Sequence, residues 1–314
     1  MEHTAHRIDV HQHAVPPEIA EAMRAAGAPF VPAWSLTETW RVLAENKIAA
    51  GLVSNPVPGG FLHGARQAAG FVRAANEASA ELVREYPARF GLLAALPMPH
   101  VDAALAELAH AYDVLGADGV VLIPQAEGRY LGSGEHDPVF AELDRRGAVV
   151  LVHPMMLPGG PVADPPSVLA DFLLDTTRGA LSLMLAEVPD RYPRIRFVLA
   201  HAGGFLPYAA ARIGALGGQF FGLSPARLRD YLGRFHYDLA LSAPSALPSL
   251  LAAVPPERVL FGTDWCAVPP ELVAANTEGY RRAPGLDERA RALIDRDNAL
   301  RLFPALARRL DPSA

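Results

Sequence analysis

The chain has 314 residues, a net charge of −6 at neutral pH and 51% hydrophobic residues. This length accommodates one large α/β barrel or two domains of average size, and the apolar content is sufficient for an extensive core. The charge is negative and no run of basic residues occurs, which argues against a nucleic-acid partner. The single cysteine, Cys266, cannot form an internal disulfide, as is usual for proteins of the reducing cytoplasm.

Neither a targeting segment nor a membrane span is evident. The first 15 residues lack the uninterrupted apolar core of a signal peptide, and no stretch approaches the roughly 18 apolar residues of a membrane helix. The Pro- and Gly-rich stretches lie between predicted elements and do not mark a domain boundary. We therefore expect a cytoplasmic protein with a single domain over residues 1–314.

Short β-rich segments alternate with helical segments along the chain. Several of the β-rich segments are continuous apolar runs, as expected for strands that are buried on both faces. Eight such alternations predict a (β/α)₈ TIM-type barrel. The predicted strands are residues 8–13, 49–55, 89–97, 118–124, 147–154, 194–201, 235–241 and 258–264, and the predicted helices include 70–86, 102–115, 138–145, 174–188 and 287–302.

A doubly wound open sheet is the alternative fold. Such a sheet normally has a glycine-rich turn after its first strand. Here the first predicted strand ends in His11-Gln12-His13 instead. This ending favours the barrel.

Four of the predicted strands end in residue types that bind metal ions. His11 and His13 end strand 1, His153 is near the end of strand 5, His201 ends strand 6 and Asp264 ends strand 8. Catalytic residues of such barrels lie at the carboxyl ends of the strands, and residues two apart on a strand point to the same face. Imidazoles combined with a carboxylate suit Zn²⁺ or a similar divalent ion. Each residue alone has an ordinary structural explanation, but their common position predicts a metal site.

Several neighbouring residues are candidates for the substrate pocket. Trp265 and Phe205 adjoin the predicted site residues, although either is equally compatible with core packing. His63 follows strand 2 in a glycine-rich loop that could reach the barrel mouth. Cys266 lies two residues after Asp264, but a thiolate site normally needs more than one cysteine.

The order of these motifs resembles the amidohydrolase superfamily, in particular the branch of aminocarboxymuconate-semialdehyde decarboxylase. The resemblance covers almost the whole chain, and residues 238–242 with 247–248 are similar to 6-methylsalicylate decarboxylases. The motifs are Asp9-x-His11-x-His13, His153-Pro154, His201-Ala202-Gly203-Gly204 and Gly262-Thr263-Asp264, together with residues 76–77, 86–90, 191–193, 205–207 and 298–304.

The resemblance implies one divalent ion, Zn²⁺ or Mn²⁺, held by His11, His13, His153 and Asp264, with His201 as an acid/base group beside it. Relatives with two metal ions usually bridge them with a carbamylated lysine on strand 4. The only lysine here, Lys47, precedes strand 2, which argues against such a pair. The resemblance also implies a homodimer.

The expected reaction is the non-oxidative decarboxylation of a small ortho-hydroxy aromatic acid that resembles 6-methylsalicylate. Muconate-semialdehyde decarboxylases clamp a second substrate carboxylate with an arginine before strand 2. Thr39 takes that position here, and Arg41 is displaced by about half a helical turn, which favours a substrate with one carboxylate. By analogy Asp264 delivers a proton to the ring, and His201 assists. The alternative is a lactonase, amidohydrolase or hydratase that uses the same metal site with His201 as general base. A non-catalytic barrel would be expected to have lost part of the ligand set.

Overall fold

The computed structural model describes residues 6–28, 30–55, 64–159 and 164–311. Eight parallel strands form one sheet, and their order in the sheet is their order in the chain. Every predicted strand is confirmed, although most of the observed strands are shorter. They are β1 (Arg7–His13), β2 (Ile48–Ser54), β3 (Phe90–Ala95), β4 (Gly119–Leu122), β7 (Val149–Val152), β8 (Arg196–Leu199), β9 (His236–Asp238) and β10 (Val259–Leu260).

Backbone hydrogen bonds between β1 and the segment after β10 close the sheet into a barrel. The amide of Val10 donates to the carbonyl of Phe261 at 3.0 Å, and the amide of Asp264 donates to the carbonyl of His11 at 2.8 Å. A further parallel bridge joins Gln12 to Trp265. The predicted barrel is therefore confirmed, and the open sheet is excluded.

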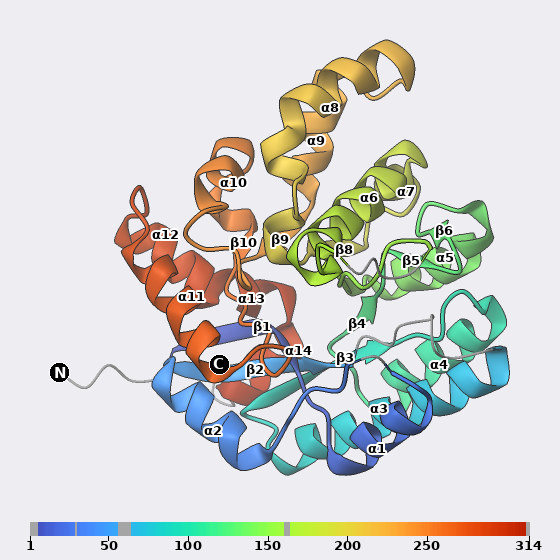
Figure 1. Cartoon of the computed structure of the whole chain (residues 1–314), viewed down its shortest axis with the longest axis vertical. Coiled ribbons are helices and arrows are strands. Elements are labelled where there is room, and N and C mark those ends of the chain that lie inside the picture. The colour runs from blue at the N-terminus through green and yellow to red at the C-terminus, as the bar shows by residue number, and fades with distance from the viewer. Residues whose placement is uncertain (1–5, 29, 56–63, 160–163, 312–314) are drawn as a thin grey trace.

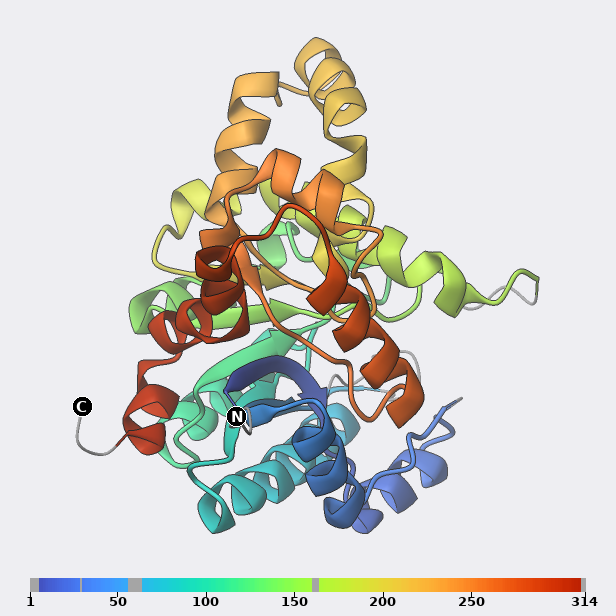
Figure 2. The same ribbon diagram turned by 90° about the vertical axis from the view of Figure 1, so that its left-hand side faces the viewer.

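Helices surround the barrel (Figures 1 and 2). The predicted helices are confirmed, and the last of them contains a π-helical turn, Leu293–Asp297, between α12 and α13. A short hairpin after β4, formed by β5 (Gln125–Ala126) and β6 (Arg129–Tyr130), is an addition to the predicted elements. The helices are α1 (Pro17–Ala25), α2 (Leu36–Glu45), α3 (Ala65–Glu85), α4 (Val101–Asp113), α5 (Asp137–Arg146), α6 (Asp171–Leu185), α7 (Val188–Arg191), α8 (Leu206–Phe220), α9 (Pro225–Arg234), α10 (Leu247–Ala253), α11 (Pro270–Arg282), α12 (Glu288–Ala292), α13 (Asn298–Leu302) and α14 (Pro304–Leu310).

The strands are buried on both faces, which explains their apolar sequences. Every residue of β1, β3, β4 and β7 is buried. In β1 the polar residues Asp9, His11 and His13 alternate with Ile8 and Val10, so one face of this strand supplies polar groups to the barrel. The pair α8–α9 projects away from the barrel in both views (Figures 1 and 2). None of the helices that the structure describes is long and apolar enough to cross a membrane.

Candidate metal centre

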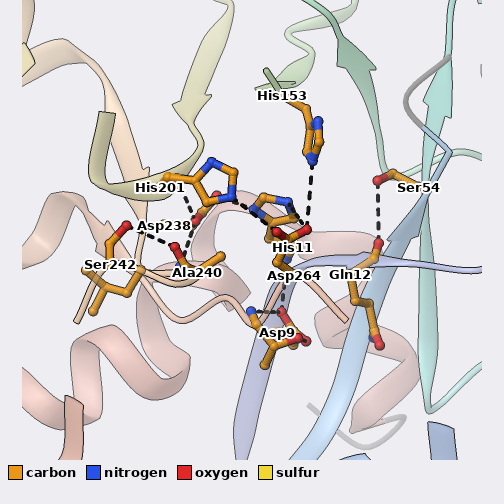
Figure 3. Close-up of polar contacts among 12 residues, drawn as sticks. Asp9, His11, Gln12, Ser54, His153, His201, Asp238, Ala240, Ser242 and Asp264 are labelled. Atoms are coloured by element: carbon orange, nitrogen blue, oxygen red, sulfur yellow. Dashed lines mark hydrogen bonds and ion pairs between the residues drawn. The ribbon is translucent and has the colours of Figure 1, made fainter. Parts of the chain in front are cut away.

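Four of the predicted site residues converge at the mouth of the barrel. His11, His13, His153 and Asp264 are buried, and their ligand atoms all lie within 4.8 Å of one another. The Nε2 atoms of His13, His11 and His153 lie 3.0, 3.3 and 3.9 Å from Oδ1 of Asp264. Figure 3 shows His11 and His153 beside the Asp264 carboxylate. The four side chains come from three strand ends that are distant in sequence, as the barrel topology requires.

The donor set fits a divalent metal ion. Donors of a tetrahedral zinc site, with bonds of about 2.0–2.1 Å, lie roughly 3.3 Å apart, which is close to the nitrogen–oxygen separations above. Nε2 of His11 and both ring nitrogens of His153 are buried and have no hydrogen-bond partner among the described residues. Buried nitrogens rarely stay unsatisfied, so these atoms are suited to bind a metal ion. The lysine-free strand β4 is consistent with a single ion.

The charges of the cluster favour an ionised Asp264. Burial opposes ionisation, but the positive charge of His11 and the hydrogen bond from His13 hold the pKa of Asp264 well below its usual value. For His11, burial lowers the pKa, but Asp238 and Asp264 outweigh it and raise the pKa well above the usual value. Burial lowers the pKa of His153 to about 3. An anionic Asp264 and a neutral His153 are the forms that bind a metal ion, whereas His11 would release its proton on metal binding.

Two of the histidines are oriented by hydrogen bonds behind the site. Nδ1 of His11 lies 2.9 Å from the buried carboxylate of Asp238, and Nδ1 of His13 lies 3.1 Å from the hydroxyl of Ser54. Both contacts leave Nε2 facing Asp264, and such partners usually set which nitrogen of a histidine binds the metal. Sequence reasoning assigned no role to Asp238 or Ser54.

A further buried carboxylate, Asp9, connects β1 with the turn that carries Asp264. It accepts hydrogen bonds from the amide of His11 at 3.0 Å and from the hydroxyl of Thr263 at 2.6 Å. Burial raises the pKa of Asp9 to about 7. Asp264 itself has a left-handed backbone conformation with φ of 64°, which is uncommon outside glycine. Through its hydrogen bonds to His11 and Thr263, Asp9 fixes the strand that carries His11 and His13 against the turn that carries Asp264.

His201 lies beside the four-residue cluster. Its Nε2 atom is 3.4 Å from Oδ2 of Asp264, the oxygen that does not face the other histidines. Its backbone amide donates to Asp238 at 3.1 Å. The chain turns sharply here, with positive φ at all four residues of His201–Gly204. At Gly204 a Cβ atom would lie 2.1 Å from the carbonyl of Leu173, so glycine is required for this close approach.

The predicted pocket residues have different surroundings. Trp265 is buried, and its indole nitrogen donates to the hydroxyl of Thr39 on α2 at 3.1 Å. Phe205 is 37% exposed at the start of α8. Cys266 is buried, and burial raises the pKa of its thiol to about 12, so it offers no thiolate near neutral pH. His63 lies outside the described residues. The pocket assignments of Phe205 and Trp265 stay predictions.

The barrel and its buried histidine–aspartate cluster define a TIM-barrel protein with a site suited to one divalent metal ion. The family model described as Amidohydrolase matches residues 8–305. The chain is 33% identical to 6-methylsalicylic acid decarboxylase of Penicillium expansum, over 97% of this chain and 98% of the relative. It is 27% identical to 2-amino-3-carboxymuconate-6-semialdehyde decarboxylase of Dictyostelium discoideum, over 67% of this chain and 60% of the relative.

A solved structure supports the same family assignment as these sequence relatives. The crystal structure of an amidohydrolase II superposes with a TM-score of 0.88 at 28% identity, covering 95% of this chain and 99% of that one. The chain belongs to the amidohydrolase family. The predicted resemblance is therefore confirmed, and the named relatives are decarboxylases, that is, carboxy-lyases.

Proposed function

We propose that this protein is a metal-dependent decarboxylase of a small ortho-hydroxy aromatic acid similar to 6-methylsalicylate. The observation that carries the proposal is an intact site of His11, His13, His153 and Asp264 in a chain that aligns with a 6-methylsalicylic acid decarboxylase over 97% of its length. The proposed resident ion is Zn²⁺ or Mn²⁺, one per chain. When bound, it would act as a Lewis acid and a template for the oxygens of the substrate.

The proposed proton donor is Asp264. An aryl carbanion is too unstable to form directly, so the ring carbon that bears the carboxylate must be protonated before CO₂ leaves. The carboxylate of Asp264 is held in its ionised form, so it must first receive the proton that it delivers. His201 is suitably placed to supply that proton, because its Nε2 lies 3.4 Å from Oδ2 of Asp264. The proton stays on the ring carbon, so His201 takes a new proton from solvent for the next turnover. Loss of CO₂ then returns the electron pair to the ring and restores aromaticity.

The surroundings of α2 support a substrate with one carboxylate. Thr39 is buried, and its hydroxyl accepts the indole hydrogen bond of Trp265. Arg41 lies at the surface of the same helix and pairs with Glu38 and Glu45. No positive charge is therefore directed from Thr39 or Arg41 towards a second carboxylate. Apolar contact from Trp265 and Phe205 with the substrate ring is part of the proposal.

A product screen tests the reaction. Metal-loaded protein is incubated with salicylates, resorcylates and lactones, and the products are analysed by mass spectrometry. Conversion of an aromatic acid to the corresponding phenol, with release of CO₂, is the expected result. Addition of water to a lactone, with no acid losing CO₂, would favour the alternative hydrolase function, in which His201 acts as the general base for attack by water.

Elemental analysis tests the metal content independently of the substrate. We expect one divalent ion per chain, and His11→Ala or His13→Ala should abolish its binding because each residue supplies a proposed ligand. Two ions per chain at full occupancy would contradict the proposal. Sequential loading with Zn²⁺ and Mn²⁺, each followed by the activity screen, would identify the ion that supports catalysis.

We also propose a homodimer, as the family resemblance implies. The projecting helix α8 and the turn after it expose Tyr208, Leu216, Phe220 and Phe221, and exposed apolar groups of this kind favour association. Light scattering at micromolar concentration should give twice the mass of the chain. A monomer would contradict this part of the proposal.

A further inference from the structure

His153 differs from the other proposed ligands in how its ring is held. His11 and His13 each have a partner at Nδ1, namely Asp238 and Ser54. Neither ring nitrogen of His153 has a hydrogen-bond partner among the described residues. Apart from the ion-pair contact of Nε2 with Asp264 at 3.9 Å, no side-chain partner in the described part of the chain orients the ring, so the position of the ring relies on the backbone that carries it.

That backbone is anchored on both sides of His153. Its own amide donates to the carbonyl of Leu122 at 2.9 Å, which continues the pairing of β7 with β4. Beyond the rigid Pro154, the amide of Met155 donates to a carboxylate oxygen of Asp175 on α6 at 3.1 Å. The next residue, Met156, accepts a hydrogen bond from the side chain of Gln125 at 2.6 Å. The segment is thus held within three residues of the ligand.

The same helix also holds the turn that carries His201. The hydroxyl of Thr177 accepts a hydrogen bond from the amide of Phe205 at 2.9 Å and donates to the carbonyl of Leu173 at 2.8 Å. Gly204 packs directly on that carbonyl. Asp175 is fully buried, and only 5% of Thr177 is exposed. Helix α6 thus contacts the His201–Gly203 turn that follows β8.

We infer that α6 is a shared support for the two histidine segments, with Asp175 positioning His153 and Thr177 positioning His201. Residues two apart on a helix point about 200° apart, so one helix can contact both segments from opposite flanks. Gly179 permits this placement, because a Cβ atom there would lie 2.8 Å from Pro124 in the loop after β4. This inference rests on the proposed metal site and assigns its positioning residues.

The proposed role of Asp175 in positioning His153 is tested by the metal affinity, measured by chelator competition on the full-length protein. Asp175→Ala should weaken metal binding at least about tenfold, the usual effect of removing a group that orients a ligand. Asp175→Asn keeps an acceptor for the Met155 amide, so its metal affinity should stay closer to wild type than that of Asp175→Ala. Asp171→Ala, on the same helix, is the matched control and should have no effect. Gln125→Ala provides a second variant of the same segment, should the Asp175→Ala protein fail to fold.

The proposed role of Thr177 in positioning His201 is tested by amide hydrogen exchange and by kcat. Thr177→Val should accelerate exchange at residues 203–206 and lower kcat about tenfold, while the metal affinity stays unchanged. Thr176→Val is a close control, because Thr176 makes the same helical bond, to Phe172, and has no hydrogen bond to the His201 turn among the described residues. Equal exchange rates and equal kcat in Thr177→Val and Thr176→Val would show that Thr177 does not position His201.

The reference variant His153→Ala separates the two proposals. If His153→Ala binds metal as wild type does, the proposed metal site is wrong. If His153→Ala loses the metal but Asp175→Ala and Gln125→Ala both bind it with wild-type affinity, the metal site stands and the supporting role of Asp175 is wrong.

Discussion

The carboxylate of Asp238 lies 2.9 Å from Nδ1 of His11, and both side chains are fully buried. Burial alone would raise the pKa of Asp238, but the positive charges and hydrogen bonds of the neighbouring histidines, His11 foremost, lower it below the usual value. Asp238 is therefore an anion that accepts a hydrogen bond from Nδ1–H of His11 and leaves Nε2 directed at Asp264. The other oxygen of Asp238 accepts a hydrogen bond from the backbone amide of His201. One residue thus orients groups from two segments of the site.

This relationship predicts a loss of metal affinity when the carboxylate is removed. Asp238→Ala should weaken metal binding by about 10- to 100-fold, the range found when a partner of a metal-bound histidine is lost. Competition with a coloured chelator measures the affinity. Asp230→Ala is a suitable control, because Asp230 pairs with Arg234 at the surface. Wild-type affinity in Asp238→Ala would contradict an orienting role.

A second prediction concerns the contact between Thr39 and Trp265. Thr39→Val keeps the shape of the side chain but leaves the buried indole nitrogen without an acceptor. An unsatisfied buried donor costs about 1–3 kcal/mol, so the free energy of unfolding should fall by that amount. Urea denaturation measures the change, and Thr37→Val at an exposed position of α2 is the matched control. Equal stability of both variants would show that water or another group satisfies the indole.

A third prediction concerns stability in acid. Burial, followed by the charges of Arg258 and Arg196, lowers the pKa of His236 from 6.5 to about 4. The unfolded chain therefore binds this proton more readily than the folded protein does. The stabilisation from neutral His236 is complete above about pH 6.5 and is lost as the pH falls through about 4, with a full magnitude of ~3 kcal/mol.

The comparison of wild type with His236→Asn isolates this contribution. Urea denaturation between pH 4 and 7, an interval of about three pH units around the shift, should show a steeper loss of stability in the wild type. A chelator in all samples removes the pH dependence of metal binding. Parallel curves for the two proteins would contradict the shift of the His236 pKa.

Most of the fold and of the metal site could be predicted from the sequence, for identifiable reasons. Strands buried on both faces produce apolar runs, and parallel strands of a barrel end on one rim. The residue pattern at the ends of those runs therefore predicts that His11, His13, His153 and Asp264 share one side of the barrel. Their ligand atoms indeed lie within 4.8 Å of one another.

The supporting residues are harder to recognise because their signals are weaker. Asp238 is the last residue of β9, but the apolar residues after it extend the predicted strand to 241, which places Asp238 in the middle of that strand. Leu241 in fact has a left-handed conformation, with φ of 49°, and lies outside the strand. The contacts of Asp175 and Thr177 depend on how α6 packs across two loops, and no local pattern encodes that packing. Asp9 is recognisable in the sequence only as part of a motif.

A fourth prediction distinguishes a catalytic metal from a structural one. Chelation should abolish decarboxylation but leave the far-ultraviolet circular dichroism largely unchanged, because a closed barrel of this size has an extensive core of its own. The thermal midpoint should fall, since a ligand that binds only the folded state stabilises that state. Re-addition of the ion should restore both activity and midpoint. Global unfolding on chelation would show that the metal holds the barrel together.

The last prediction tests the proton donor. Asp264→Asn keeps the shape of the side chain and an oxygen that can face the metal, but the amide cannot deliver a proton. The three histidines remain as ligands, so we expect the variant to keep bound metal, with reduced affinity, when the ion is supplied in excess. Because a positioned acid typically contributes about 10²- to 10⁴-fold to the rate, kcat should fall by at least about a hundredfold. Elemental analysis of the same sample must show the ion, so that lost activity is not simply lost metal. A metal-loaded Asp264→Asn protein that decarboxylates at the wild-type rate would transfer the role of proton donor to another group, and His201, 3.4 Å away, would be the next residue to replace.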